Sequence, residues 1–203
     1  MHDHQPTNHD STAEDAAANE RERALAPEPR VYVASLADYN NGGLHGVWLN
    51  VAREPAEIRA DIAKMLALSK YPDAEEWAIH DQIDFGTWRV NEYDSIELVA
   101  RIANGIKQHG LAFAAWADVH ESDPERFNDF EAAYIGQFDS VDTYAYQLAD
   151  DFGYHAELDK LPESMRSIVS IDYAVMARDL EAGGELYVYP DPSGGVWLFD
   201  GNV

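Results

Sequence analysis

The chain has 203 residues, of which 38 are Asp or Glu and 14 are Lys or Arg, so its formal net charge is -24 at pH 7. It has no cysteine, which excludes disulfides, thiolate metal ligands and a cysteine nucleophile. No apolar run reaches the roughly 18 residues that a membrane span needs, and the polar start lacks an apolar signal-peptide core. We therefore expect a soluble, cytoplasmic protein that does not bind membranes.

The first 29 residues are expected to form a disordered tail. They carry seven acids, two arginines and a single large aliphatic side chain, Leu25, which is too little apolar surface to offset the entropy cost of ordering. From Arg30 onward there are 31 acids and 12 bases, a net charge of -19. Most of the negative charge therefore belongs to the part of the chain that folds.

Residues 30–91 are predicted to form an N-terminal α+β domain. Runs of β-forming residues predict strands at 31–34, 44–49 and 77–80. Asn and Gly residues predict a turn at 40–43. Apolar residues at helical spacing predict a helix at 56–68 that begins at Pro55.

Residues 92–137 are predicted to form a helical middle domain. Ser95 is a suitable N-cap for a helix that ends at Gly110. Its apolar stripe consists of Ile96, Val99, Ile102, Ala103 and Ile106. A second helix is expected to begin at Pro124 and to turn Phe127, Phe130 and Tyr134 inward.

Residues 138–203 are predicted to form a C-terminal α+β domain, with helices at 140–152 and 172–180 and strands at 185–189 and 195–199. The first helix is expected to bury Val141, Ala145, Leu148 and Phe152. The five tryptophans are expected to lie in the core: Trp48, Trp77, Trp88, Trp116 and Trp197. The predicted fold class is α+β, an elongated chain of about three small α/β domains with short antiparallel sheets and a helical middle segment.

Acidic residues are densest between Asp118 and Glu163, where 13 acids accompany two bases, Arg126 and Lys160. Aromatic residues at helical spacing lie between the acids, so the segment can fold while its carboxylates point outward. A fixed negative field of this kind is suited to a basic partner. The whole chain carries the phosphate charge of roughly 12 base pairs of DNA, as an imitation of DNA would need.

The candidate partner-binding acids are Asp118, Glu121, Asp123, Glu125, Asp129, Glu131, Asp139, Asp142, Asp150, Asp151, Glu157 and Asp159. No catalytic residue, metal ligand or cofactor is predicted. The pair His80 and Asp81 is interpreted as structural, because no serine elbow or second base accompanies it. The tail residues His2, Asp3, His4, His9 and Asp10 are expected to hold a metal only adventitiously.

Other functions remain open from composition alone. The acidity can serve solubility or reflect a salt-adapted cell. Paired acids such as Asp150 with Asp151, or Asp129 with Glu131, are the groups a carboxylate-based or metal-dependent hydrolase would use. A general acidic chaperone for basic proteins is a third possibility.

Four ordered blocks resemble the ArdA family of antirestriction proteins. The first, from Pro29 to Gly42, reads Pro-Arg-Val-Tyr-Val-Ala-Ser-Leu-Ala-Asp-Tyr-Asn-Asn-Gly and continues into Leu-His-Gly-Val-Trp-Leu at 44–49. The second is Glu-Glu-Trp-Ala-Ile-His-Asp at 75–81. The remaining two consist of Phe130, Tyr134, Gly136, Asp139, Tyr144, Ala145 and residues 148–151, and of residues 171–173 with 177–180.

This resemblance implies a non-catalytic homodimer, built of three small α/β domains per chain, whose carboxylates imitate the phosphates of bent DNA. The implied partner is a type I restriction-modification enzyme, bound through its methyltransferase core, and no nucleic acid is bound. Proteins of this family are carried by mobile genetic elements. The family's acidic antirestriction motif would align with residues 148–152, whereas the first 29 residues have no counterpart in the family.

Overall fold

The computed structural model describes residues 26–203, so the predicted tail falls almost entirely outside the described residues. The chain divides into two compact units. The first runs up to Phe85 and includes Val90–Gly110, and the second consists of Gly86–Arg89 and Leu111–Val203. The predicted division into three domains, at 91/92 and 137/138, remains a prediction.

The first unit contains a three-stranded antiparallel sheet in the order β2-β1-β3. The strands are β1 (Arg30–Ser35), β2 (Gly46–Asn50) and β3 (Trp77–Ile83). A short helix, α2 (Leu36–Asn40), follows β1 directly, and Ser35 caps it by accepting the N–H of Asp38. The predicted strands are thus confirmed, whereas α2 was not anticipated.

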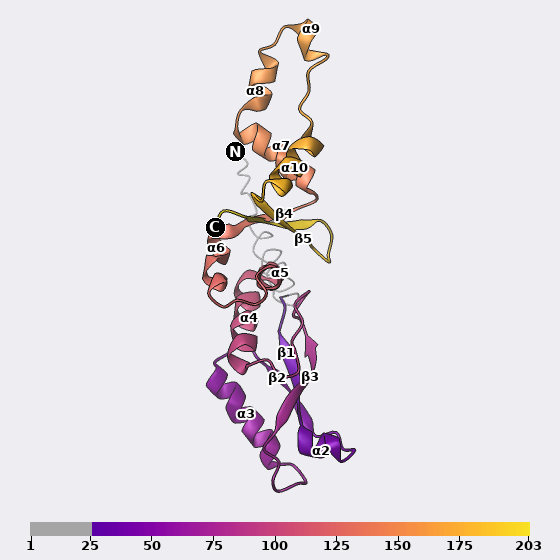
Figure 1. Cartoon of the computed structure of the whole chain (residues 1–203), viewed down its shortest axis with the longest axis vertical. Helices are drawn as coiled ribbons and strands as arrows, with labels where there is room; N and C mark the ends of the chain where they lie inside the picture. Colours follow the sequence, from indigo (N-terminus) through magenta and orange to yellow (C-terminus); the bar gives the residue numbers. More distant parts are fainter. Residues whose placement is uncertain (1–25) are drawn as a thin grey trace, which may run out of the picture. The chain divides into compact units, whose positions relative to one another are not determined.

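Two amphipathic helices complete this unit (Figure 1): α3 (Pro55–Ala67) contacts β1, β2 and α4 (Ile96–His109). Pro55 stands in the first turn of α3, where its missing N–H costs nothing. Ser95 caps α4 through the N–H of Leu98, and Gly110 follows the helix at a φ of 76°. The predicted apolar stripe of α4 is buried, and α3 buries Ile58, Ile62 and Met65, as helical periodicity requires.

The second unit contains another three-stranded antiparallel sheet, in the order β4-β6-β5. Its strands are β4 (Tyr134–Phe138), β5 (Leu186–Pro190) and β6 (Val196–Asp200). Its helices are α5 (Leu111–Val119), the 3-10 turn η1 (Arg126–Asp129), α6 (Phe130–Ala133), α7 (Val141–Asp151), α8 (Tyr154–Asp159), α9 (Glu163–Arg166) and α10 (Tyr173–Ala182).

An aromatic cluster forms the core of this second unit. Trp116 is fully buried, and its ring centroid lies 5.2 Å from that of Phe199 on β6. Phe130 stacks on Tyr134 with ring centroids 5.2 Å apart, and Phe113 lies equally close to Phe130. Through these contacts, α5 and α6 pack against the same sheet that α7 and α10 contact.

The prediction of one helix from Pro124 through Tyr134 is wrong. The chain forms a 3-10 turn and one turn of α-helix, and Tyr134 then begins strand β4. The aromatic spacing that suggested one long helix instead reflects a shared contact with Phe199.

Two predicted core side chains lie at the surface. Phe152 is 60% exposed, because α7 ends at Asp151, and its ring centroid lies 5.6 Å from that of Tyr154. Trp48 is 39% exposed and packs against Tyr32 across the first sheet. Among the other tryptophans, Trp88, Trp116 and Trp197 are buried, as predicted. The mixed fold with short antiparallel sheets is confirmed.

Candidate acidic binding surface

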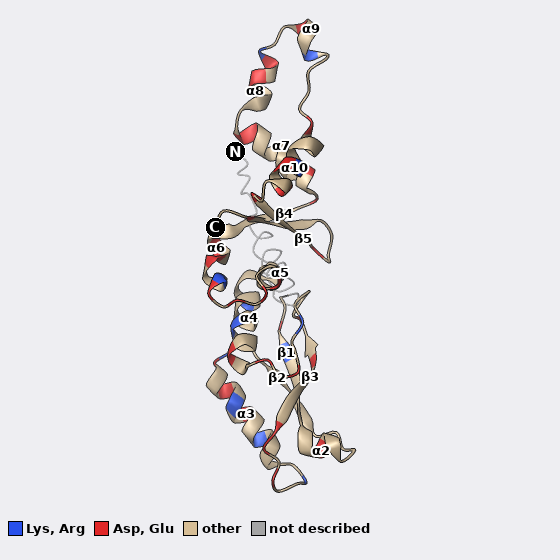
Figure 2. Ribbon diagram, viewed as in Figure 1, with Lys and Arg blue, Asp and Glu red and all other residues tan. Residues whose placement is uncertain are grey.

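All twelve predicted partner-binding acids belong to the second unit, and eleven of them are exposed. The exception, Asp129, is half-buried and pairs with Arg126, with 3.0 Å between Oδ2 and Nη1. Figure 2 shows acidic residues on α7 and α8, and both signs of charge on α3 of the first unit. The role of these acids in binding a partner remains a prediction.

Several of these carboxylates have partners within the described chain, and Asp123, for example, accepts the backbone N–H of Glu125 at 2.9 Å. Asp129 has Arg126, and Glu157 binds Lys160 at 2.6 Å. Asp150 accepts from Nδ1 of His155 at 3.0 Å. Asp118 accepts a hydrogen bond from the hydroxyl group of Tyr189, and burial followed by this contact raises the pKa of that phenol.

Other candidate acids have no cation beside them. Within residues 26–203, no Lys, Arg or His forms an ion pair with Glu121, Asp139, Asp142, Asp151 or Asp159. The second unit as a whole has 19 acids and five bases, a net charge of -14. Its carboxylates therefore remain available to an external cation.

In the first unit, some of the acids are paired with nearby cations. Asp61 accepts from Lys64 at 2.8 Å and from Arg53 at 2.6 Å, and these two cations hold its pKa below the usual range. Arg59 pairs with Glu97 between α3 and α4. The described part of this unit carries 13 acids and seven bases, a net charge of -6. The strong negative field therefore belongs mainly to the second unit.

The helix α7 displays its polar groups in a row. Asp142, Tyr146 and Asp150 follow one another at intervals of four residues and so lie on one face of the helix. With a rise of about 1.5 Å per residue, the two carboxylates are separated by about 12 Å along the axis. Ser140 caps the helix by accepting the N–H of Thr143 at 3.2 Å, which fixes where this row begins.

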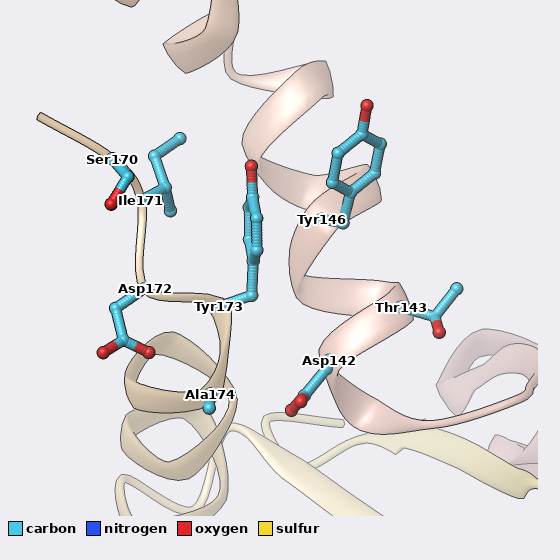
Figure 3. Close-up of a pocket in the computed structure, with 8 residues that line it drawn as sticks. All are labelled: Asp142, Thr143, Tyr146, Ser170, Ile171, Asp172, Tyr173 and Ala174. Atoms are coloured by element: carbon cyan, nitrogen blue, oxygen red, sulfur yellow. The ribbon is translucent and has the colours of Figure 1, made fainter. Parts of the chain in front are cut away.

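Beside this row is a hollow of about 580 Å³, the Tyr146–Tyr173 hollow, lined by Asp142, Thr143, Tyr146, Ile171, Asp172 and Tyr173 among others. Figure 3 shows the two tyrosine rings standing on neighbouring segments, with the carboxylates of Asp142 and Asp172 toward one end. The ring centroids are 5.3 Å apart. This hollow was not predicted from the sequence, although the four-residue spacing along α7 places Tyr146 between Asp142 and Asp150.

An imidazole links this hollow to the acidic helix α8. Nε2 of His155 lies 2.8 Å from the hydroxyl oxygen of Tyr173, while Nδ1 lies 3.0 Å from Asp150. Because a carboxylate only accepts, Nδ1 carries the proton, and in the neutral ring Nε2 accepts from the Tyr173 hydroxyl group. The ring of Tyr173 is thereby held in one orientation.

The structure does not bring His80 and Asp81 into a catalytic arrangement with a second base. Asp81 accepts from the N–H of Gln82 at 2.8 Å, and the ring of His80 packs edge-on against Tyr39 at 4.7 Å. His80 is the extra residue at the irregularity between β1 and β3. The tail residues that were expected to hold a metal only adventitiously lie outside the described residues. In the described part, no three His, Asp or Glu residues are grouped to hold a metal ion.

A second histidine of the same unit is half-buried. His120 packs 4.0 Å from the Trp116 ring and 5.7 Å from Tyr187. Burial, followed by the nearby charge of Arg126, lowers its pKa, so the ring is favoured in its neutral form. These contacts assign His120 to the aromatic core.

Comparison with known proteins gives one family. The sequence model described as antirestriction protein (ArdA) matches residues 31–192, which is most of the chain and includes the acidic surface. No curated protein matches the chain. Within residues 26–203, no helix combines the length and apolar character needed to cross a membrane.

Proposed function

Because this chain belongs to the ArdA family of antirestriction proteins, which inhibit type I restriction enzymes, we propose that it acts as a DNA mimic. Its exposed carboxylates would occupy the groove in which the methyltransferase core of such an enzyme holds DNA. The proposed action is competition for a binding site, with no bond made or broken.

One observation carries this proposal: the second unit concentrates a net charge of -14 with most of its acids exposed and several without internal cations. Double-stranded DNA carries about one charge per 1.7 Å of axis, so this unit matches the phosphate load of roughly seven base pairs. Like charges on neighbouring helical positions destabilise a fold by a few tenths of a kcal/mol per pair. Favourable binding free energy with a basic partner would explain why these like charges are kept.

The affinity would come from the same source as that of DNA. A groove lined with Lys and Arg gains free energy when its cations displace condensed counterions from phosphates. Carboxylates fixed on folded helices can satisfy these cations without presenting base edges. Since phosphate contacts position a protein and base contacts specify sequence, such a mimic would inhibit enzymes with different recognition sequences.

We further propose that the protein works in the cytoplasm as a homodimer. Two copies would present two such acidic units to one enzyme. This assembly is the one that membership of the family suggests.

Transfer of unmodified DNA into a living host tests the proposal. Phage plating or plasmid transfer is measured in a host with an active type I system, with and without this protein, and in a matched host without the system. The proposal predicts that the protein restores transfer in the first host and changes nothing in the second. Unchanged restriction at full expression would refute it.

A further inference from the structure

Building on the proposed function, we infer that the Tyr146–Tyr173 hollow is a binding site for one arginine side chain of the basic partner. This site would bind one side chain by direct contact, whereas the remaining acidic surface would attract the partner's positive charge at longer range. Its ligand is a guanidinium group on a flexible stem, whose planar fork of donors is suited to binding phosphates and carboxylates.

The shape and lining of the hollow match this ligand. Its volume is about 580 Å³, and Tyr146, which is 55% exposed, presents its ring to solvent at the opening. The ring of Tyr173 stands beside it at 5.3 Å and 57°, so a planar cation can lie against an aromatic face (Figure 3). Tyrosine rings attract cations through their quadrupoles, and arginine uses this interaction more often than lysine.

Carboxylates supply the second element of recognition. Asp142 lies one helical turn before Tyr146 on α7, and no residue of the described chain forms an ion pair with it. Asp172 uses Oδ1 to cap α10, accepting the N–H of Val175 at 3.0 Å. Its Oδ2 has no partner in the part of the chain described. Two oxygen acceptors therefore lie within the lining of one aromatic hollow, an arrangement that suits the forked donors of arginine.

The hollow is held in shape before any ligand arrives. His155 binds the hydroxyl group of Tyr173 at 2.8 Å, and its ring centroid lies 4.7 Å from that of Tyr146. Asp142 sits in the capped first turn of α7, and Asp172 is itself a cap. A preformed site loses less conformational entropy on binding, which distinguishes the hollow from carboxylates on freely rotating surface side chains.

A titration of the full-length protein followed by two-dimensional NMR tests this assignment. The probes are N-acetyl-arginine methylamide and N-acetyl-lysine methylamide. The arginine probe is expected to shift the amide signals of residues 142–146 and 171–174 in a saturable way, and to bind more tightly than the lysine probe. Shifts spread evenly over the acidic helices, or equal binding of the two probes, would overturn the assignment.

Four variants make the test specific. Tyr146→Leu removes the aromatic ring and is expected to weaken the arginine probe about fivefold, whereas Tyr146→Phe keeps the ring and the affinity. Asp142→Asn is expected to weaken it as well. Asp159→Asn makes the same change of charge on an exposed acid of α8 and is expected to leave binding unchanged. Equal losses in Asp142→Asn and Asp159→Asn would show that only net charge matters.

Displacement of DNA from a type I methyltransferase core separates this inference from the proposed function. If the wild-type protein displaces DNA but the hollow does not prefer arginine, the inference fails and the proposed function stands. If the hollow binds arginine but DNA is not displaced, the proposed function fails instead.

Discussion

The hydroxyl oxygen of Tyr173, at the start of α10, lies 2.8 Å from Nε2 of His155 on α8. The other ring nitrogen of His155 contacts Asp150 near the end of α7. One imidazole thus connects three helices of the second unit, which together carry many of its acids. The arrangement of the acids therefore depends on this histidine contact as well as on the acids themselves.

Replacing His155 by alanine should destabilise the second unit by about 1 kcal/mol, because the hydroxyl group of Tyr173 loses its hydrogen-bond partner. Urea denaturation followed by circular dichroism measures the change. Gln147→Ala on the exposed face of α7 is a suitable control and should change stability by less than about 0.5 kcal/mol. Equal stability of the two variants would contradict a linking role for the imidazole.

Neutralising many acids of the second unit should abolish inhibition, whereas neutralising any one should reduce it slightly, because the field is distributed. The eight changes are Glu121→Gln, Asp123→Asn, Glu125→Gln, Asp139→Asn, Asp142→Asn, Asp151→Asn, Glu157→Gln and Asp159→Asn. Inhibition of DNA cleavage by a type I enzyme is the measurement.

A matched variant of the first unit separates position from net charge. It neutralises eight exposed acids there: Glu54, Glu57, Asp73, Glu75, Glu76, Asp81, Asp84 and Glu92. This variant should retain more inhibition than the first at the same total charge. Equal loss in the two would mean that the second unit has no special role.

The buried carboxylate of Asp38 should make stability depend on pH in the acid range. Asp38 is 3% exposed and accepts from the hydroxyl group of Ser69 at 2.5 Å, the main cause that lowers its pKa from 3.8. A lowered folded-state pKa contributes stability that is complete above the unfolded value and is lost as the pH falls through the folded value. Asp38→Asn should therefore show a weaker loss of stability below about pH 4 than the wild type. Identical acid profiles in denaturant titrations would contradict this assignment.

Gly195 should tolerate no side chain. Its φ is 83°, and an added Cβ would collide with the carbonyl oxygen of Phe138 on β4. Gly195→Ala should cost about 2 to 4 kcal/mol, measured by thermal denaturation. Gly153 has a similar φ of 74° but open space around it, so Gly153→Ala should cost only about 1 to 2 kcal/mol. If Gly195→Ala destabilised the protein no more than Gly153→Ala, the backbone of β4 would be able to move away from the added Cβ.

Local signals predicted most elements of this fold. Ser95 caps α4 as predicted, by accepting the backbone N–H three residues ahead. Ser140 and Asp172, which begin two of the predicted helices, cap α7 and α10 in the same way. The apolar stripe of α4 is buried as its period required. Capping and periodicity depend on residues within a few turns of one another, so they can be read from one chain.

The errors occur where distant contacts decide the structure. Tyr134 continues the aromatic spacing of Phe127 and Phe130, yet its backbone pairs with Phe199 on β6, more than 60 residues away. The hollow likewise requires Tyr146 to meet Tyr173 across the contact between α7 and α10. The exposure of the acids followed from helical spacing, whereas the aromatic rings among them could be placed only by tertiary packing.

The most direct measurement of the central claim is displacement of a labelled DNA duplex from a type I methyltransferase core by this protein, at two salt concentrations. If carboxylates replace phosphates, the protein displaces the duplex completely, and its own affinity for the enzyme falls steeply as salt rises, as expected for counterion release. Simultaneous binding of the protein and the duplex, or an affinity that salt does not change, would contradict the account.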